Sequence, residues 1–326
     1  MPITVSDFSA LTDDLQSIFN EVSKRKISES VGFKIFDVRE TNRRTFDHLI
    51  LHGLAGIQKV TPGQDLPLVT SEQGDTITYT QEYYGARVAI TKEMRKFDLY
   101  NQIESLVRSI TQDAWDKIDQ SLADRLLHGW STSYTDVYGE TVSAVGPDGL
   151  ALFSASHTTP VSSRTFSNII SDGTNTNPPL SRDAIVYMRR VGLTYRDPNG
   201  IIRPINYDTL IVPPSLEDLA IRIVESERLP GSNYNDVNPV KGWIKNIIVW
   251  PRLQQASDGT DTSAYWFLAD SSMVKETLKC LFAERPTLDP PEVVYENKNW
   301  EYTCDFFYAI GTGFPAYIAG SKGDNS

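Results

Sequence analysis

The fold is decided by residues 178–226, which read PPLSRDAIVYMRRVGLTYRDPNGIIRPINYDTLIVPPSLEDLAIRIVES. Ser181 is a suitable helix N-cap, and the apolar residues Ile185 and Met188 follow it at helical spacing. Gly192 then supplies the residue type that most often ends a helix. This part of the sequence therefore predicts an amphipathic helix of about three turns that stops at Gly192.

A tight turn, a strand and a second helix are predicted next. Asp197-Pro198-Asn199-Gly200 favours a chain reversal, because Pro fixes φ and Gly accepts a positive φ. The apolar, β-branched run Thr209–Val212 is ended by Pro213-Pro214, which predicts a buried strand. Ser215 is the expected cap of a helix with two acids in its first turn. The apolar face of that helix consists of Leu219, Ala220, Ile223 and Val224.

The order of these elements carries a family resemblance. Residues 180–191 (LSRDAIVYMRRV) and 197–226 resemble the apical domain of the major capsid proteins of tailed bacteriophages, most of all the Mu-like major head subunits. Residues 151–157 (ALFSASH) are similar to the LFS..H segment of those proteins, although Thr158-Thr159 stands where Gly-Asn often follows. The resemblance implies an α+β protein with the Hong Kong 97-like capsid fold and a structural role as major capsid (head) protein.

On this resemblance the chain divides into five parts. They are an N-terminal arm (1–56), an extended β-hairpin loop (57–92), a peripheral domain (93–180) with a long spine helix at about 98–129, an apical domain (181–290), and C-terminal strands that return to the peripheral domain (291–326). The resemblance also implies an icosahedral shell of pentamers and hexamers, assembled in the host cytoplasm. Its implied partners are separate scaffold, portal and decoration proteins, and packaged DNA that is not bound by sequence.

A long hairpin is the simplest interpretation of the region before residue 91. Residues 75–80 alternate polar and apolar side chains, residues 81–85 favour a corner, and residues 86–90 form a second strand. Because an isolated hairpin is marginally stable in water, we expect it to lie against its own core or against a neighbouring copy. The candidate inter-subunit contact residues are Tyr79, Glu82, Tyr83, Tyr84 and Arg87.

The clearest predicted helix covers residues 98–129. Its apolar residues keep helical spacing, Gly129 marks its end, and at about 1.5 Å per residue it would be about 45 Å long. A coiled coil fits less well, because the apolar stripe lacks sustained heptads. The stripe consists of Ile103, Leu106, Val107, Ile110, Ala114, Ile118, Leu122 and Leu126.

The remaining regions give shorter signals. Residues 11–22 and 45–54 are amphipathic, the second as a helix, but residues 1–56 predict no compact domain and are expected to find their partners in other copies. Residues 129–179 read as loops with short strands around 150–153. Further strands are expected at 243–250 and 265–269, and a hairpin at 292–295 and 300–310.

Composition limits the function classes. The 326 residues carry 31 basic and 42 acidic side chains, a net charge of −11, and the small basic cluster Lys24-Arg25-Lys26 does not reverse that balance. This net charge argues against a surface that binds phosphate backbones.

The N-terminus MPITVSDF lacks the features of a signal peptide, and no apolar run is long enough to span a bilayer. Cys280 and Cys304 are expected to be buried thiols in a reducing compartment.

Enzymatic readings are weak. Ser154, Ser156 and His157 lack the strained elbow and the orienting acid of a hydrolase. His48 and His52 would share one face of a helix, but without a third ligand they predict a surface pair and no metal site. No phosphate or dinucleotide motif is present, so we expect no catalytic, cofactor or metal residues and no enzyme activity.

A hydrolase or carbohydrate-binding domain is the alternative function. It would use Trp243, Trp250, Trp266 and Trp300 to line a groove, although aromatic residues in strand patterns are more often core.

Covalent cross-linking of a shell through a loop Lys is not expected. Residues 75–90 contain no Lys, and Lys59 and Lys92 lie only at the ends of the predicted hairpin.

Overall fold

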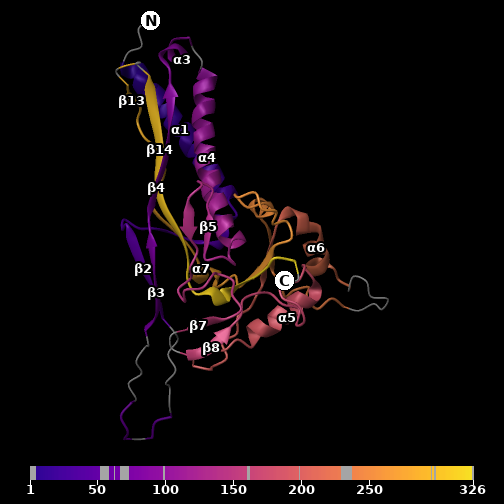
Figure 1. Ribbon diagram of the computed structural model, residues 1–326. Helices are drawn as coiled ribbons and strands as arrows, with labels where there is room; N and C mark the ends of the chain where they lie inside the picture. The colour runs from indigo at the N-terminus through magenta and orange to yellow at the C-terminus, as the bar shows by residue number, and fades with distance from the viewer. Residues whose placement is uncertain are drawn as a thin grey trace.

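The computed structural model describes residues 5–51, 59–61, 63–66, 73–97, 100–159, 162–197, 199–228, 237–294, 296 and 299–324. Figure 1 shows a long part that contains α1, α4, β4 and β14, and a lobe at its side that contains α5 and α6. The helices are α1 (Val5–Glu29), α2 (Gly32–Ile35), α3 (Lys92–Lys96), α4 (Tyr100–Leu127), α5 (Arg182–Leu193), α6 (Glu217–Glu225) and α7 (Val274–Thr277). No helix of the described ranges is both long and apolar enough to cross a membrane.

A five-stranded sheet runs through the long part. It orders β1 (Asp37–Glu40), β12 (Leu278–Leu288), β14 (Trp300–Thr312) and β13 (Glu292–Val293), and β4 (Glu82–Ile90) pairs with the opposite edge of β14. β1 is parallel to β12, whereas the other pairs are antiparallel. The predicted hairpin of the C-terminal region is confirmed by the pairing of β13 with β14.

β12 was not predicted from the sequence, because a proline interrupts its strand pattern. Its register against β14 shifts twice between Phe282 and Thr287, and Pro286 lies in that interval. Proline has no N–H to donate to a ladder, so a strand can hold it only at an edge or a bulge. The bulges therefore let a sequence that reads as broken form an eleven-residue strand.

The spine helix is confirmed as α4, and α1 packs along it. Phe19 and Val22 of α1 are buried, the indole N–H of Trp115 donates to Ser23 Oγ at 3.0 Å, and Lys26 pairs with Asp116 at 2.9 Å. The expectation that residues 1–56 lack partners in their own chain is therefore wrong for α1. An amphipathic helix buries its apolar face wherever a matching face is available, and α4 provides one.

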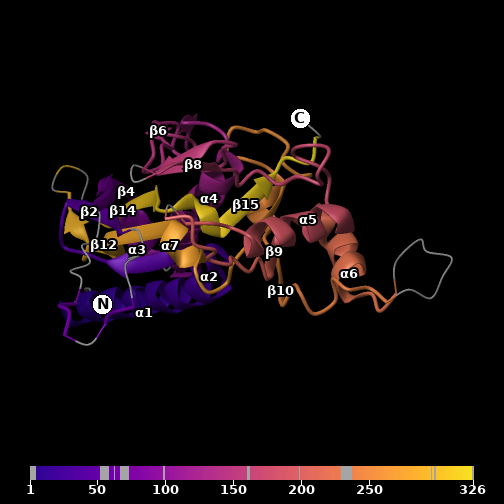
Figure 2. The same ribbon diagram turned by 90° about the horizontal axis from the view of Figure 1, so that it is seen from below.

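The lobe is built on a four-stranded sheet. Its order is β10 (Asn246–Val249), β9 (Thr209–Val212), β11 (Trp266–Ala269) and β15 (Ile318–Ser321), so the strands predicted within 209–212, 243–250 and 265–269 are confirmed. Figure 2 shows this lobe at one end of the molecule and α1, β12 and β14 at the other. β15 follows β14 in the chain but pairs with β11, so the C-terminal segment contributes to both sheets.

This sheet is buried on both faces. Leu210 and Val212 of β9 belong to the core formed with α5 and α6, whereas Ile211 between them belongs to the core that contains α1 and α4. In β11, Leu268 belongs to the core with α5 and α6, and Phe267 belongs to the core with α1 and α4. Side chains alternate faces along a strand, so a strand between two cores needs apolar residues at every position.

The helices of the deciding segment are confirmed, with two corrections at their ends. Ser181 Oγ accepts a hydrogen bond from the backbone N–H of Ala184 as expected, but α5 continues through Gly192 to Leu193. Ser215 does not cap the second helix. A 3₁₀ turn precedes α6, whose N-cap is Leu216, and the Ser215 hydroxyl donates to the carbonyl of Ser263 instead. The hydroxyl of Ser215, predicted from the local sequence to cap the helix, therefore makes a tertiary hydrogen bond instead.

The predicted hairpin over residues 75–90 is wrong. β3 (Gln73–Thr80) pairs with β2 (Thr45–Leu51), and β4 pairs with β14. β3 and β4 run on past Gln81 (Figure 1), because Gly85 serves as a close contact with β14 and not as a corner. Residues 45–51 are therefore a strand and not a helix. The β2–β3 ribbon packs on β12 and β14 of its own chain through Tyr79 and its neighbours.

The region between α4 and α5 holds four short strands. They are β5 (Ser133–Thr135) with β6 (Thr141–Ser143), and β7 (His157–Thr159) with β8 (Ser162–Phe166). The strand expected around 150–153 is absent from this fully described stretch. Leu152 and Phe153 are buried as loop residues, and Phe153 packs on Gly129 and Gly320. Their apolar character reflects burial under the lobe and not strand pairing.

Gly192 is a close-packing position, which generates a prediction. A Cβ at this residue would lie 2.6 Å from the carbonyl oxygen of Ile205 and 2.9 Å from the ring of Tyr207. We expect Gly192→Ala to destabilise the fold by about 2 kcal/mol through overpacking, although Ala normally favours a helix. Urea denaturation measures this, with Arg190→Ala on the exposed side of the same helix as the control. An unchanged or raised stability of Gly192→Ala would contradict the packing role.

Candidate functional site

The candidate contact residues lie on β3 and β4, and β4 is an edge strand. All nine of its residues pair with β14, from Glu82 opposite Tyr308 to Ile90 opposite Trp300, and no described strand pairs with its other edge. An unpaired edge presents backbone N–H and C=O groups that can pair with another chain. β1 and β4 are both edge strands of the five-stranded sheet, and β4, with nine residues against four in β1, offers the longer edge.

Three of the candidates are exposed on this strand. The Tyr83 side chain is 58% exposed, its ring packs 4.6 Å from Phe307, and its hydroxyl donates to Asp305 at 3.0 Å. Arg87 is also exposed and lies 3.4 Å from a carboxylate oxygen of Glu301. Glu82 is exposed at the start of the strand. Each of these exposed side chains also has a contact within its own chain, since Glu82 accepts a hydrogen bond from the Tyr84 hydroxyl at 2.6 Å.

The other two candidates point into their own chain. Tyr84 is half-buried in a stack of rings, 4.3 Å from Tyr138 and 5.0 Å from Tyr308, and its hydroxyl donates to Glu82 at 2.6 Å. Tyr79 is buried, with its ring against Gly311. Alternation along the strands separates these residues from Tyr83, which sequence position alone did not reveal.

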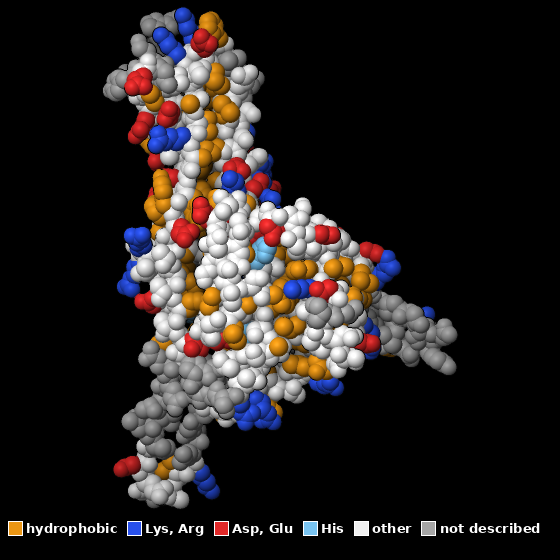
Figure 3. Space-filling view, in the orientation of Figure 1, with side chains coloured by type: hydrophobic (Ala, Val, Ile, Leu, Met, Phe, Trp, Pro, Cys, Tyr) orange, Lys and Arg blue, Asp and Glu red, His pale blue; other side chains and the backbone are white. Residues whose placement is uncertain are grey.

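The face of the molecule drawn in Figure 3 shows no concentration of basic charge. On the face drawn in Figure 3, basic and acidic side chains are interspersed, and hydrophobic side chains are exposed along the long part. The large exposed hydrophobic residues near α4 and β4 are Tyr83, Phe97 and Leu106. Leu106 was predicted for the buried stripe of the helix, but it is 37% exposed. This face resembles one that meets another protein more than one that holds nucleic acid.

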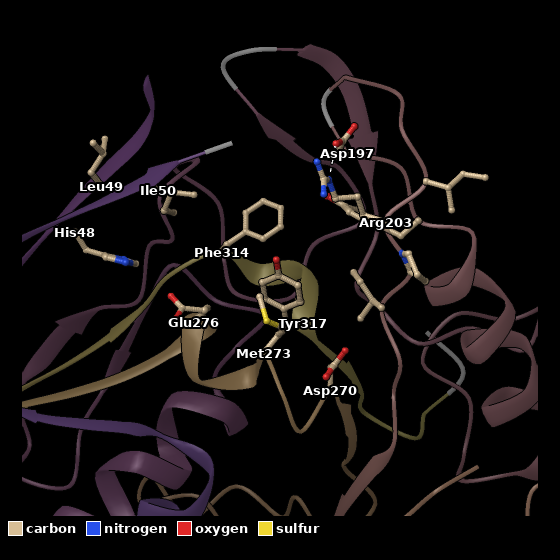
Figure 4. Close-up of a pocket in the computed structure, with 14 residues that line it drawn as sticks. His48, Leu49, Ile50, Asp197, Arg203, Asp270, Met273, Glu276, Phe314 and Tyr317 are labelled. Carbon is tan, nitrogen blue, oxygen red and sulfur yellow. Dashed lines mark hydrogen bonds and ion pairs between the residues drawn. The ribbon is translucent and has the colours of Figure 1, made fainter. Parts of the chain in front are cut away.

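A hollow of about 740 Å³ lies between β2 and the segment 195–205 (Figure 4). Its charged groups are engaged within the chain. Arg203 pairs with Asp197 at 2.9 Å, Asp270 accepts the backbone N–H of Asn206 at 3.0 Å, and Glu276 binds Lys279 at 3.3 Å. The hollow therefore has none of the nucleophile and base pairs that hydrolysis needs.

His48 forms part of the wall of this hollow. It lies on β2, where burial lowers its pKa, and it stacks on Tyr79. Its predicted neighbour His52 lies outside the described residues. Over the ranges that the structure covers, no three His, Cys, Asp or Glu side chains are grouped so as to hold a metal ion. The helical His pair does not exist, because residue 48 is in a strand.

His157 is buried in a hydrogen-bond network and does not face a serine. Its Nδ1 lies 2.6 Å from Asp148 Oδ2, and its Nε2 lies 3.2 Å from the carbonyl oxygen of Leu152 and 3.1 Å from Asn168 Oδ1. Both ring nitrogens are engaged by Asp148, Leu152 and Asn168, and none of these partners is Ser154, so the ring is not arranged as a base for that serine. The interpretation of His157 as a hydrogen-bonding residue is confirmed, and it anchors the loop below the lobe.

The aromatic and thiol candidates are core residues. Trp250 and Trp266 are fully buried and Trp300 nearly so, whereas Trp243 is half-buried against the lobe core with the Arg189 guanidinium 4.8 Å from its ring. The four side chains therefore do not line one groove as the carbohydrate-binding alternative requires. Cys280 and Cys304 are free and buried, and burial raises the pKa of both thiols, that of Cys304 to about 12. Neither is a reactive nucleophile.

Comparisons with known proteins give the family of this chain. The family model described as phage capsid protein matches residues 74–320, which is most of the chain. The chain therefore belongs to the phage capsid protein family, and it is a structural major capsid protein with an α+β, Hong Kong 97-like fold. None of the curated proteins compared with it matches.

Solved structures agree on the fold. The chain is similar to the structure titled capsid of empty GTA particle computed with C5 symmetry, with a TM-score of 0.51 and 12% identity over 90% of this chain and 89% of that one. It is also similar to a structure titled Mycobacterium phage Adephagia, with a TM-score of 0.50 and 11% identity over 90% and 89% of the two chains. At these identities the similarity concerns the fold alone, and the likeness to Mu-like subunits stays a prediction.

The pair of Asp148 and His157 generates a prediction about stability and pH. Burial alone would raise the pKa of Asp148, but the hydrogen bond and charge of His157 outweigh it and hold that pKa below its ordinary value. We expect Asp148→Asn to lower the free energy of unfolding by about 3 kcal/mol at neutral pH, because it leaves a buried imidazole without its counter-charge.

The pH dependence follows from the direction of this shift. A carboxyl group with a lowered folded-state pKa stabilises the fold above its unfolded pKa, and loses that contribution as pH falls through the folded value. The difference between wild type and Asp148→Asn should therefore shrink below about pH 4 in denaturation curves. Asp65→Asn, at an exposed position, is the control and should behave as wild type. A constant difference at all pH values would contradict the pairing.

Proposed function

We propose that this chain assembles with copies of itself into the pentamers and hexamers of an icosahedral shell that encloses the viral genome. The observation that carries the proposal is the unpaired edge of β4, which bears exposed Tyr83 and Arg87 over a rigid sheet. Glu82 lies on the same strand, so the edge offers both signs of charge to a partner. Closed symmetry then repeats one modest contact many times around the shell.

The five-part division of the chain belongs to this proposal. The described β2–β3 ribbon and β4 together take the place of the extended loop predicted for 57–92, and α4 that of the spine helix. Most of residues 181–290 supply the lobe proposed as the apical domain, whereas β12, at the end of that range, lies in the five-stranded sheet of the long part. The contacts of α1 with α4 favour an N-terminal segment that is anchored on its own subunit before it meets others.

We also propose that the chain acts without catalysis. His157, Trp250, Trp266, Trp300 and both Cys residues serve the fold, and the hollow beside β2 holds no reactive pair among its described lining residues. Packaged DNA would be confined by the shell and not bound by sequence, in keeping with the net charge of −11. Scaffold, portal and decoration proteins are the expected separate partners, and assembly is expected in the host cytoplasm.

Electron microscopy of the expressed chain, alone and with a scaffold protein, tests the proposal. Capsomers, tubes or closed shells are the expected result. A folded chain that stays monomeric under all assembly conditions would overturn it.

Charge reversal at Arg87 should weaken assembly while leaving the subunit folded. Arg87→Glu places a second negative charge beside Glu301 and changes the charge of every repeated contact, so the yield of particles should fall at least about tenfold. Sedimentation measures particles, and circular dichroism checks the fold. Arg25→Glu is the matched control, since Arg25 is an exposed residue of α1 that lies near a single acid, Glu29. Equal particle yields for the two variants would remove β4 from the interface.

Assembled particles should dissociate into single chains when heated in denaturant. The reason is the lack of Lys within residues 75–90, which leaves no donor there for an isopeptide bond between copies. A denaturing gel of heated particles measures this. A ladder of dimers and larger species would show that a covalent link exists.

A further inference from the structure

A second hollow, of about 360 Å³, lies where β3, α4, β14 and the segment 134–146 meet. Its wall includes hydroxyl-bearing Tyr, Ser and Thr side chains beside apolar ones. The tyrosines that line it are Tyr79, Tyr84, Tyr134 and Tyr308. The hollow also exposes one side of Arg125, which comes from the last turn of α4.

Arg125 is a buried cation without a counter-charge. Its residue is 3% exposed, its Nη1 donates to the carbonyl of Ser143 at 3.0 Å, and its Nη2 donates to Thr312 Oγ1 at 3.0 Å. Tyr134 adds a further side-chain hydrogen bond. All of these groups are neutral, no carboxylate of the described residues forms an ion pair with the guanidinium, and Nε has no hydrogen-bond partner.

Tyr79 presents a second unused donor to the same hollow. It is 5% exposed, and its hydroxyl has no hydrogen-bond partner. Its ring packs against Gly311. A Cβ at residue 311 would come within 1.8 Å of the ring, so the close packing requires glycine at this position. Burial raises the pKa of Tyr79, which keeps the hydroxyl protonated and able to donate.

The two carboxylates in the wall are committed elsewhere. Asp136 Oδ1 accepts the backbone N–H groups of Tyr138 and Glu140, both at 2.9 Å. Glu82 accepts the hydroxyl of Tyr84 at 2.6 Å. Neither of these carboxylates forms an ion pair with the guanidinium of Arg125, and a buried charge without a direct partner is costly to the fold.

We propose that this hollow is an oxyanion site in which Arg125 pairs with a carboxylate or phosphate group and Tyr79 donates a hydrogen bond to the same group. The planar fork of a guanidinium matches the oxygens of these anions better than it matches chloride. Binding requires a small movement of the Tyr79 ring, which no hydrogen bond of its hydroxyl opposes. The anion is either free in solution or an acidic side chain of a second copy, and the second source rests on the proposed assembly.

The first experiment uses the unassembled full-length chain, so its outcome does not depend on shell formation. Thermal unfolding is followed in sodium phosphate and in sodium chloride of equal ionic strength. A free anion that binds the folded chain raises Tm, by about 3 °C or more in phosphate, because it stabilises only the folded state. Tyr79→Phe and Arg125→Met should lose this rise.

The variants separate an anion site from a merely structural role. The Tyr79 hydroxyl makes no hydrogen bond in the free chain, so Tyr79→Phe should melt as wild type in chloride and differ only in phosphate. It therefore tests the site even if Arg125→Met fails to fold. Arg108→Met, on the same helix but outside this hollow, is the matched control and should keep the full rise.

The second experiment distinguishes the two sources of the anion. If the anion comes from a second copy, unassembled wild type gains nothing from phosphate, but its assembled particles melt higher than those of Tyr79→Phe. A rise in phosphate that depends on Tyr79 and Arg125 supports a free oxyanion. If neither the phosphate rise nor particle stability depends on these two residues, the oxyanion site is refuted.

Discussion

The structure depends on a four-stranded sheet that is apolar on both faces. One face of the sheet packs in the core that contains α5 and α6, and the other face packs in the core that contains α1 and α4. The lobe therefore cannot move away from the long part without exposing apolar side chains to water. Polar contacts fix the same junction. The Trp250 indole donates to Asp119 of α4 at 3.2 Å, and Arg252 pairs with Asp116 at 2.8 Å. The subunit is therefore a rigid unit on which exposed strands can be presented.

This rigidity bears on how a shell protein can work. Since α1 is already packed on α4 and the described β2–β3 ribbon lies on its own sheet, the surface left for other copies is narrower than an extended arm and loop would give. The edge of β4 is the clearest part of that surface. Strand edges are usually blunted in monomeric proteins, and an edge that is left open over a buried sheet suits a protein whose stable state is an assembly.

Two buried polar side chains, His157 and Arg125, illustrate the cost of polar groups in these cores. His157 has Asp148 beside it, so its site is complete within one chain. Arg125 has only hydroxyl and carbonyl groups around it. In the sequence neither residue is distinguishable from an ordinary loop histidine or a helix-surface arginine. The difference comes from which segments meet at the base of α4, and those segments are far apart in the chain.

The sequence by itself determined the elements whose signals are local. The helices α4 and α5, the strands β9 and β11 and the turn at residue 200 follow from periodicity, apolar runs and turn residues, and the resemblance carried by residues 178–226 led to the family. Only the tertiary structure decided which strands pair and which side chains are exposed. β3 joined β2 and not β4, Gly192 was a packing site and not a helix stop, and Tyr79 turned inward while Tyr83 faced out. The physical reason is that strand pairing and burial are settled between residues distant in the chain, and no local pattern records them.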